Sequence, residues 1–86
     1  MNYNPARGVR WAVEEDGILI VDQREKKSLK LNQTESALWQ LNMVRTPYSQ
    51  LSLFLSLVKG IPIIEADRFI EELFELWRKQ RFLTDR

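Results

Sequence analysis

The sequence lacks the side chains that enzymes use most often for chemistry. It contains no histidine and no cysteine, which removes the commonest general base, the thiol nucleophile and the usual nitrogen and sulfur ligands of zinc or copper. It also has no glycine-rich phosphate loop. Carboxylates alone could hold Mg²⁺ or Ca²⁺ in principle. We nevertheless expect a protein that is not an enzyme and that uses no cofactor and no metal.

The carboxylates themselves are poorly arranged for acid–base catalysis. Glu71 and Glu72 are neighbours on a predicted helix, so their side chains point apart. The other acidic run, Glu14-Glu15-Asp16, falls in a predicted turn, where water solvates the charges. Binding of another molecule is therefore a better hypothesis than catalysis.

Length and composition favour one small soluble domain with a binding surface. The chain has 86 residues, of which 44% are hydrophobic and 29% charged, and its net charge is +1. A chain of this size buries only about 60–65% of its unfolded surface, so a surface groove is easier to build than an enclosed active site. The small net charge gives no strong attraction to nucleic acid or membranes. The sequence shows neither a membrane span of ~20 apolar residues nor a signal peptide, so we expect a cytoplasmic location.

The N-terminal part predicts a polar lead-in followed by a first strand. Residues 1–6 are polar, and we expect them to be flexible. Val9, Trp11 and Val13 then recur at a period of two, which predicts a strand. Asp16-Gly17 is a strong hairpin signal, so a second strand should follow directly.

Two further strands complete a predicted antiparallel meander. Residues 17–22 form an apolar run rich in β-branched side chains, typical of a central strand covered on both faces. Residues 27–32 alternate again, with Leu29 and Leu31 predicted to face inward. This third strand lies at an edge of the sheet.

The hydrophobic period changes from two to that of a helix after the third strand. Asn32 and Glu35 have the spacing of a capping box, which predicts a first helix running to about Asn42. Thr46-Pro47 predicts the start of a second helix, and Gly60 its end.

The last part of the chain predicts one long helix. It should run from about residue 65 to residue 80, after an extended link at 61–64, and residues 82–83 should fold back on the core. The result is one α+β domain over residues 7–86, a three-stranded antiparallel sheet followed by three helices.

The segment from Asp22 to Leu41, DQREKKSLKLNQTESALWQL, resembles the PqqD-like family of RiPP recognition elements. The positions that match the pattern of the family at its usual spacing are Asp22, Leu31-Asn32, Thr34, Leu38-Trp39 and Leu41. Together with the Asp-Gly-Ile-Leu start of the second strand, the resemblance covers the chain from about Arg7 to Leu83.

This resemblance implies a winged helix-turn-helix-like domain that binds peptide instead of DNA. In the family, the leader region of a ribosomally made precursor peptide adds as a strand to the third strand of the sheet. The side chains of the leader enter the groove between that strand and the third helix. The implied partners are the precursor leader peptide and either a modifying enzyme, such as a radical-SAM protein, or a leader peptidase. The size of the chain and its third strand look closest to the free-standing proteins of lasso-peptide biosynthesis.

The physical case for peptide binding begins with the edge of the third strand, whose unpaired N–H and C=O groups invite another strand. Lys27 and Lys30 could protect this edge, as lysines often do, or the edge could accept a peptide by β-augmentation. The same edge would allow two copies to pair, so both a monomer and an edge-paired homodimer stay open.

The third helix supplies the other side of the predicted groove. Its core stripe is predicted to consist of Phe69, Ile70, Leu73, Leu76 and Trp77. Beside it lies a row with one aromatic residue among charges, in which Phe74 either widens the buried face or forms the floor of the groove. The complete candidate peptide-binding site is Lys27, Ser28, Leu29, Lys30, Leu31, Asp67, Ile70, Glu71, Phe74 and Arg78.

Other large apolar residues are assigned to the core. Trp11, Trp39 and Trp77 are more typical of core positions than of ligand contacts. Leu53 and Leu57 lie off the main stripe of the second helix. We expect them to be buried, with an exposed patch for the partner enzyme as the alternative.

A winged-helix DNA-binding protein is the alternative function. A basic wing would be formed by Arg24, Lys26, Lys27 and Lys30. The third helix would have to enter the DNA groove, but it carries Glu65, Asp67, Glu71, Glu72 and Glu75. These carboxylates would repel phosphates, so we expect no nucleic-acid partner.

Overall fold

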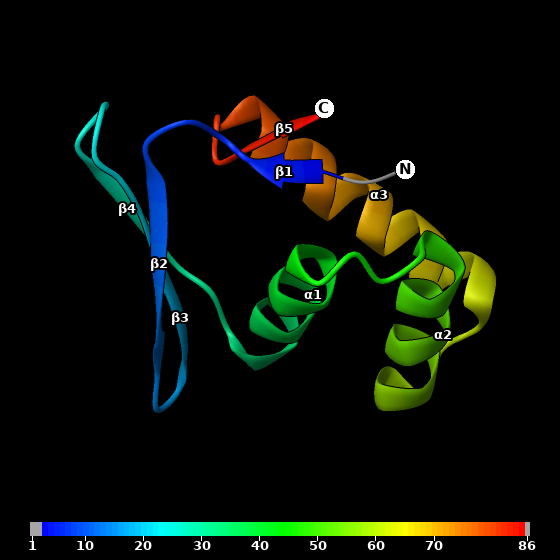
Figure 1. Cartoon of the computed structure of the whole chain (residues 1–86). Helices are drawn as coiled ribbons and strands as arrows, with labels where there is room; N and C mark the ends of the chain where they lie inside the picture. The colour runs from blue at the N-terminus through cyan, green and yellow to red at the C-terminus, as the bar shows by residue number, and fades with distance from the viewer. Residues whose placement is uncertain (1–2, 86) are drawn as a thin grey trace.

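The computed structural model describes residues 3–85. In chain order, its elements are β1 (Tyr3–Pro5), β2 (Val9–Glu14), β3 (Gly17–Asp22), β4 (Lys27–Lys30), α1 (Gln33–Met43), α2 (Tyr48–Lys59), α3 (Ile63–Lys79) and β5 (Leu83–Asp85) (Figure 1). A three-stranded sheet of order β2-β3-β4 precedes the three helices. The predicted α+β class and this element order are confirmed.

The sheet is an antiparallel meander with β3 in the centre. Val9 pairs with Asp22 at one end of the β2–β3 ladder, and Lys27 pairs with the same Asp22 in the β3–β4 ladder. Alternate residues of β3 are buried, and those between them are half-buried. The predicted central strand is therefore covered fully on one face and partly on the other.

The chain passes very close to itself where β4 leads into α1. A Cβ added to Gly17 would lie 2.1 Å from the carbonyl oxygen of Leu31, so only glycine fits at this position. Next to it, the hydroxyl of Ser36 accepts a hydrogen bond of 2.8 Å from the N–H of Ile18. These contacts fix the start of α1 against the sheet.

The N-terminal segment differs from the prediction. We expected residues 1–6 to be flexible, but Tyr3–Pro5 forms β1, which pairs antiparallel with Leu83–Asp85. The N–H of Ala6 also donates to the carbonyl of Phe82 at 3.0 Å. A three-residue strand shows no recognisable alternation, and its partner lies at the other end of the chain, so no local signal predicts this pairing. Met1 and Asn2, which belong to the same prediction, lie outside the described residues.

The capping box of α1 and the end of α2 agree with the prediction, whereas Pro47, predicted as the first helical residue of α2, is its N-cap and no side chain caps this end. The side chain of Asn32 accepts from the N–H of Glu35 at 2.8 Å, and the Glu35 carboxylate accepts from the N–H of Asn32 at 3.0 Å. Helix α2 ends at Gly60, whose φ of 66° is left-handed. The extended link predicted for residues 61–64 is wrong at its end, because α3 already begins at Ile63, directly after Pro62.

The core is built around aromatic rings. Trp39 and Trp77 are fully buried with ring centroids 5.3 Å apart, and the half-buried Trp11 lies 5.5 Å from Trp39. The prediction of three core tryptophans is therefore confirmed for two of them and partly for Trp11. Phe82 and Leu83 are buried as predicted.

Several other predicted burials are wrong. Phe69 and Leu76 of α3 are 42% and 50% exposed, whereas Phe74 is only 1% exposed. On α2, Leu53 and Leu57 are exposed instead of buried. In both helices the apolar positions cover a wider arc than the neighbouring elements can bury.

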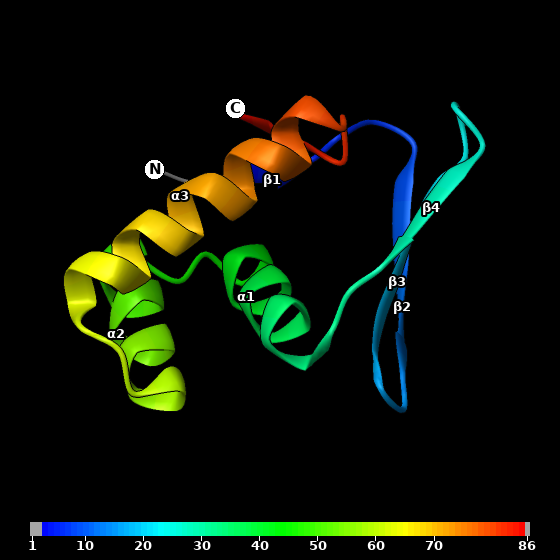
Figure 2. The same cartoon turned by 180° about the vertical axis from the view of Figure 1, so that it is seen from behind.

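The elements form an open arrangement around α1. Helix α1 lies between the sheet and α2, and α3 runs past them to end beside β1 and β5 (Figure 1). Seen from behind, α3 lies in front of β1, and β4 is on the same near side as α3 (Figure 2).

Candidate functional site

The outer edge of β4 has no partner strand among residues 3–85. Strand β4 pairs only with β3, and the N-terminal strand β1 pairs with β5 instead of covering this edge. The edge predicted from the sequence therefore exists, with backbone groups that another strand can bond.

The register shows which backbone groups face outward. The N–H of Leu31 donates to the carbonyl of Ile18 at 2.8 Å, so these two residues form a hydrogen-bonded pair. Such pairs alternate along an antiparallel ladder, which makes Leu29 and Ile20 the next one. The N–H and C=O groups of Ser28 and Lys30 therefore point away from β3, toward the open edge.

The two lysines of β4 are held by contacts within the chain. The Lys30 ammonium lies 2.7 Å from the Glu14 carboxylate and 2.8 Å from that of Asp16, across the sheet. The hydrogen bond from Lys30 lowers the pKa of Asp16. The Lys27 ammonium donates to the carbonyl of Gln80 and lies 5.1 Å from the centre of the Phe82 ring. Both side chains thus tie β4 to the rest of the protein.

An exposed apolar stripe of α3 lies on the side of the helix away from β1. Phe69, Leu73 and Leu76 recur at i, i+4 and i+7, so they share one face. Phe69 and Leu76 are 42% and 50% exposed, whereas Leu73, which lies closer to the core, is only 8% exposed. Phe74, on the flank of α3 that meets β1, lies about 140–160° around the helix from Phe69 and Leu76. Leu29 of β4 is half-buried and packed against the core.

The structure brings the predicted residues Lys27–Lys30 together in β4 and places Leu31 directly after the strand, buried in the core. It places the predicted charged row of α3 elsewhere. At about 100° per residue, Asp67, Glu71 and Arg78 lie about 160–200° around α3 from Phe69. Asp67 accepts a hydrogen bond from the Ser52 hydroxyl of α2, which fixes this side of α3 against α2. The charged row therefore faces away from the apolar stripe.

The remaining two predicted residues of α3 belong to the core. Ile70 is completely buried. Phe74 stacks on Trp77 with ring centroids 5.4 Å apart and meets Tyr3 edge-on at 5.5 Å. The alternative in which Phe74 widens the buried face is the one that agrees with these contacts. The sequence does contain a signal for the apolar stripe, since α3 has more apolar residues than one core face requires.

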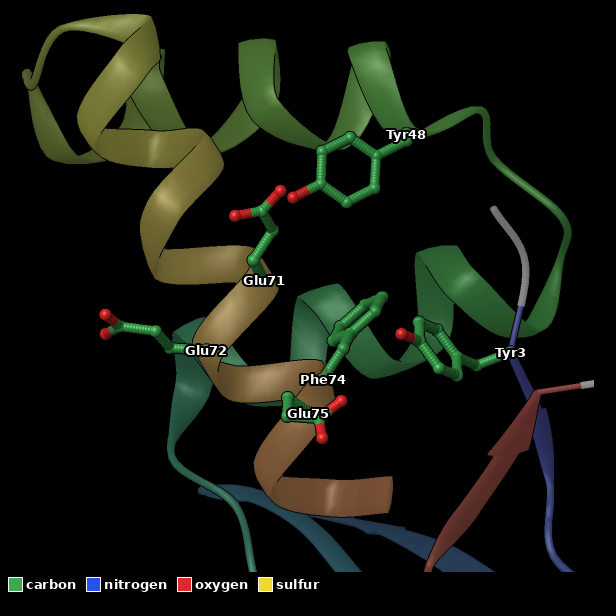
Figure 3. A pocket seen from close by; sticks show the side chains of 6 residues that line it. All are labelled: Tyr3, Tyr48, Glu71, Glu72, Phe74 and Glu75. Atoms are coloured by element: carbon green, nitrogen blue, oxygen red, sulfur yellow. The ribbon is translucent and has the colours of Figure 1, made fainter. Parts of the chain in front are cut away.

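A second feature, the acidic hollow, opens on the β1 side of α3. It has a volume of about 630 Å³. Its lining residues are Tyr3, Tyr48, Glu71, Glu72, Phe74 and Glu75. Figure 3 shows Tyr48 and Tyr3 on opposite sides of Phe74, with the carboxylates rising from α3. Sequence analysis missed the two tyrosines, because they come from β1 and from the first residue of α2, far from α3 in the chain.

The hydroxyl of Tyr48 is a structural group and not a base. It donates to the carbonyl of Asp67 at 2.9 Å. Burial, followed by the negative charges of Glu71 and Asp67, raises its pKa to about 12. The hydroxyl therefore keeps its proton at neutral pH and holds the start of α2 against α3.

Residues 3–85 contain neither a metal-binding cluster nor a helix suited to cross a membrane. No group of three or more acidic residues is placed to hold a metal ion. None of the helices in this range has the length and hydropathy of a membrane span.

Comparison with known proteins gives structural matches only. No protein-family model and no curated protein matches the sequence. Among solved structures, one described as lasso peptide synthetase B1 complexed with the leader peptide matches with a TM-score of 0.91 and 16% identity, over 99% of this chain and 100% of that chain. A second, TbiB1 in complex with the TbiA(beta) leader peptide, matches with a TM-score of 0.87 and 12% identity, over 100% of this chain and 98% of that one. The fold implied by the family resemblance is thereby confirmed.

Proposed function

We propose that this protein binds the leader region of a ribosomally made precursor peptide and presents it to a modifying or leader-cleaving enzyme. The leader would add as a further strand to the open edge of β4, next to the apolar stripe of α3. The observation that carries this proposal is the unpaired β4 edge in a fold shared with two proteins whose structures hold leader peptides. The protein itself would act as a binding module of lasso-peptide biosynthesis in the cytoplasm.

Backbone pairing alone would not give a useful affinity. Ser28 and Lys30 each offer one N–H and one C=O at the edge. Hydrogen bonds contribute about 0.5–1.5 kcal/mol each, so this set supplies roughly 2–6 kcal/mol before the entropy of association is subtracted. Micromolar to nanomolar binding needs about 8–12 kcal/mol. Apolar side chains of the leader must therefore contribute most of the difference, and the apolar stripe is the surface suited to receive them.

The exposed stripe also explains why peptide binding fits better than DNA binding. Phosphate groups gain nothing from Phe69 and Leu76, which are exposed. The carboxylates of Glu71, Glu72 and Glu75, also on α3, would repel them. The guanidinium of Arg78 pairs with this acidic group, at 3.0 Å from the carboxylate of Glu75.

The decisive experiment is titration of isotope-labelled protein with the leader peptide encoded beside it, followed by heteronuclear NMR. We expect the largest shifts and new protection from hydrogen exchange at the amides of Ser28 and Lys30. Perturbations restricted to the acidic hollow, or absent from β4, would contradict strand addition.

A proline variant tests the same contact by mutation. Ser28→Pro removes an outward N–H without touching the β3–β4 ladder, because proline is tolerated at sheet edges. The leader would lose one hydrogen bond and keep an unsatisfied carbonyl, which costs about 1–3 kcal/mol, or about a tenfold or larger loss of affinity. Ser28→Ala keeps the N–H and is the control, which should bind like the wild type. Equal leader affinity in both variants would exclude the edge as the site.

A further inference from the structure

The acidic hollow is not used by the proposed leader site and has a chemistry of its own. We propose that it is a docking site for an arginine side chain of the enzyme that acts on the bound leader. This inference rests on the proposed function, since it assumes that such an enzyme approaches the complex. Its chemistry, however, is argued from the hollow alone.

The charges of the hollow are only partly compensated. Glu75 pairs with Arg78, which lowers the pKa of the Glu75 carboxyl. Within residues 3–85, neither Glu71 nor Glu72 forms an ion pair. The same negative field contributes to the raised pKa of Tyr48. A positive charge placed in this space would therefore be attracted.

The walls of the hollow favour arginine over lysine. Tyr3 and Tyr48 present aromatic rings on the side of Glu71 and Glu75, over the buried Phe74, whereas Glu72 points away from them (Figure 3). A guanidinium group stacks on aromatic faces and binds carboxylates with two parallel hydrogen bonds, whereas an ammonium group offers a strongly hydrated point charge. Arginine is also enriched among the residues that dominate binding energy at protein interfaces.

The hollow is formed before any partner arrives. The Tyr48 hydroxyl is fixed on the carbonyl of Asp67, and the ring of Tyr3 stands edge-on to the buried Phe74. Little ordering of this surface is required when a ligand binds, which favours affinity.

The position of the hollow allows leader and enzyme to bind together. Glu71 and the apolar stripe point in nearly opposite directions from α3, so a leader on the β4 side would leave the hollow open. The enzyme would thus bind the protein at the hollow while the leader is bound on the other side of α3.

A charge reversal separates the two surfaces. We expect Glu71→Lys to leave the leader affinity unchanged and to lower the affinity for the enzyme encoded beside this protein by about tenfold or more, since it replaces an attraction with a repulsion at the hollow. Glu15→Lys, in the turn between β2 and β3, makes the same charge change at an exposed position outside the hollow and is the control. It should change neither affinity.

Each alternative result has a defined meaning. Unchanged enzyme affinity in Glu71→Lys would overturn the docking site, and so would an equal loss in both charge variants. A wild-type protein that binds no leader would instead overturn the proposed function. Self-association abolished by Glu71→Lys would show that a second copy occupies the hollow, which would also overturn the inference.

A small-molecule probe tests the chemistry without the enzyme. Acetyl-arginine methylamide should shift the amide signals of Tyr48, Glu71 and Phe74, and salt should weaken the response. The citrulline analogue has nearly the same shape without the charge and should give no such shifts. Equal responses to both compounds, or no response to arginine, would contradict an arginine site.

Discussion

The two sides of α3 differ in how far their side chains are covered or bonded by the rest of the chain. On the β1 side, Asp67 and Arg78 are bonded to groups of the same chain, and Phe74 is sealed in the core. On the β4 side, Phe69 and Leu76 remain exposed without a covering element among the described residues. An exposed apolar stripe costs solubility and gives nothing to an isolated domain. The contrast agrees with the proposal that the exposed flank receives another chain, whereas the β1 flank also maintains the fold.

The largest effect is expected from a substitution of the buried Phe74 on the β1 side of α3. Phe74→Ala would remove a fully buried ring and its contacts with Trp77 and Tyr3. Core truncations of this kind lower the free energy of unfolding by about 3–5 kcal/mol. Chemical denaturation would measure the loss. A decrease comparable with that of an exposed residue would mean that the ring is not part of the core.

The matching alanine substitution in the exposed apolar stripe of α3 should separate leader binding from folding stability. Phe69→Ala is expected to change the free energy of unfolding by no more than about 0.5 kcal/mol, because the ring is 42% exposed. Its loss from the interface should weaken leader binding by about 2 kcal/mol, or roughly 30-fold. Fluorescence anisotropy with a labelled leader would measure the affinity. The exposed Leu57 of α2, changed to alanine, provides a control that should leave leader binding intact.

The smallest effect concerns the titration of the Tyr48 hydroxyl, in the acidic hollow. The pKa of Tyr48 is raised from 10.0 to about 12, so folding favours the protonated hydroxyl. Its contribution to stability is complete below the ordinary pKa and is lost as the pH rises through the raised value. Near-ultraviolet absorbance should show one tyrosine titrating late. Glu71→Gln should move this titration to lower pH, whereas Glu15→Gln should not.

Local sequence signals predicted the elements well and the surfaces less well. The capping box of Asn32 and the helix stop at Gly60 are encoded within a few residues, so they could be recognised directly. The edge position of β4 followed from the order of the strands. Which flank of α3 faces β4 depends instead on how the whole helix is rotated, and adjacent sequence positions carry no information on that rotation.

The pairing of segments far apart in the chain could not be predicted from the sequence either. The strand Tyr3–Pro5 forms only because Leu83–Asp85 comes back beside it, and neither segment is long enough to show a period. The two tyrosines of the acidic hollow depend on the same kind of distant contact. The part of the site built by one strand was therefore predictable, and the part assembled from several elements was not.

The pairing of β1 with β5 brings the two ends of the described chain together on one side of the molecule (Figure 1). A fluorescent label or an immobilising tag attached through a linker at either end would thus start far from β4 and leave peptide access unhindered. The same proximity should permit a circular permutant, in which a short linker joins the old ends and new ones open in the exposed turn between β2 and β3.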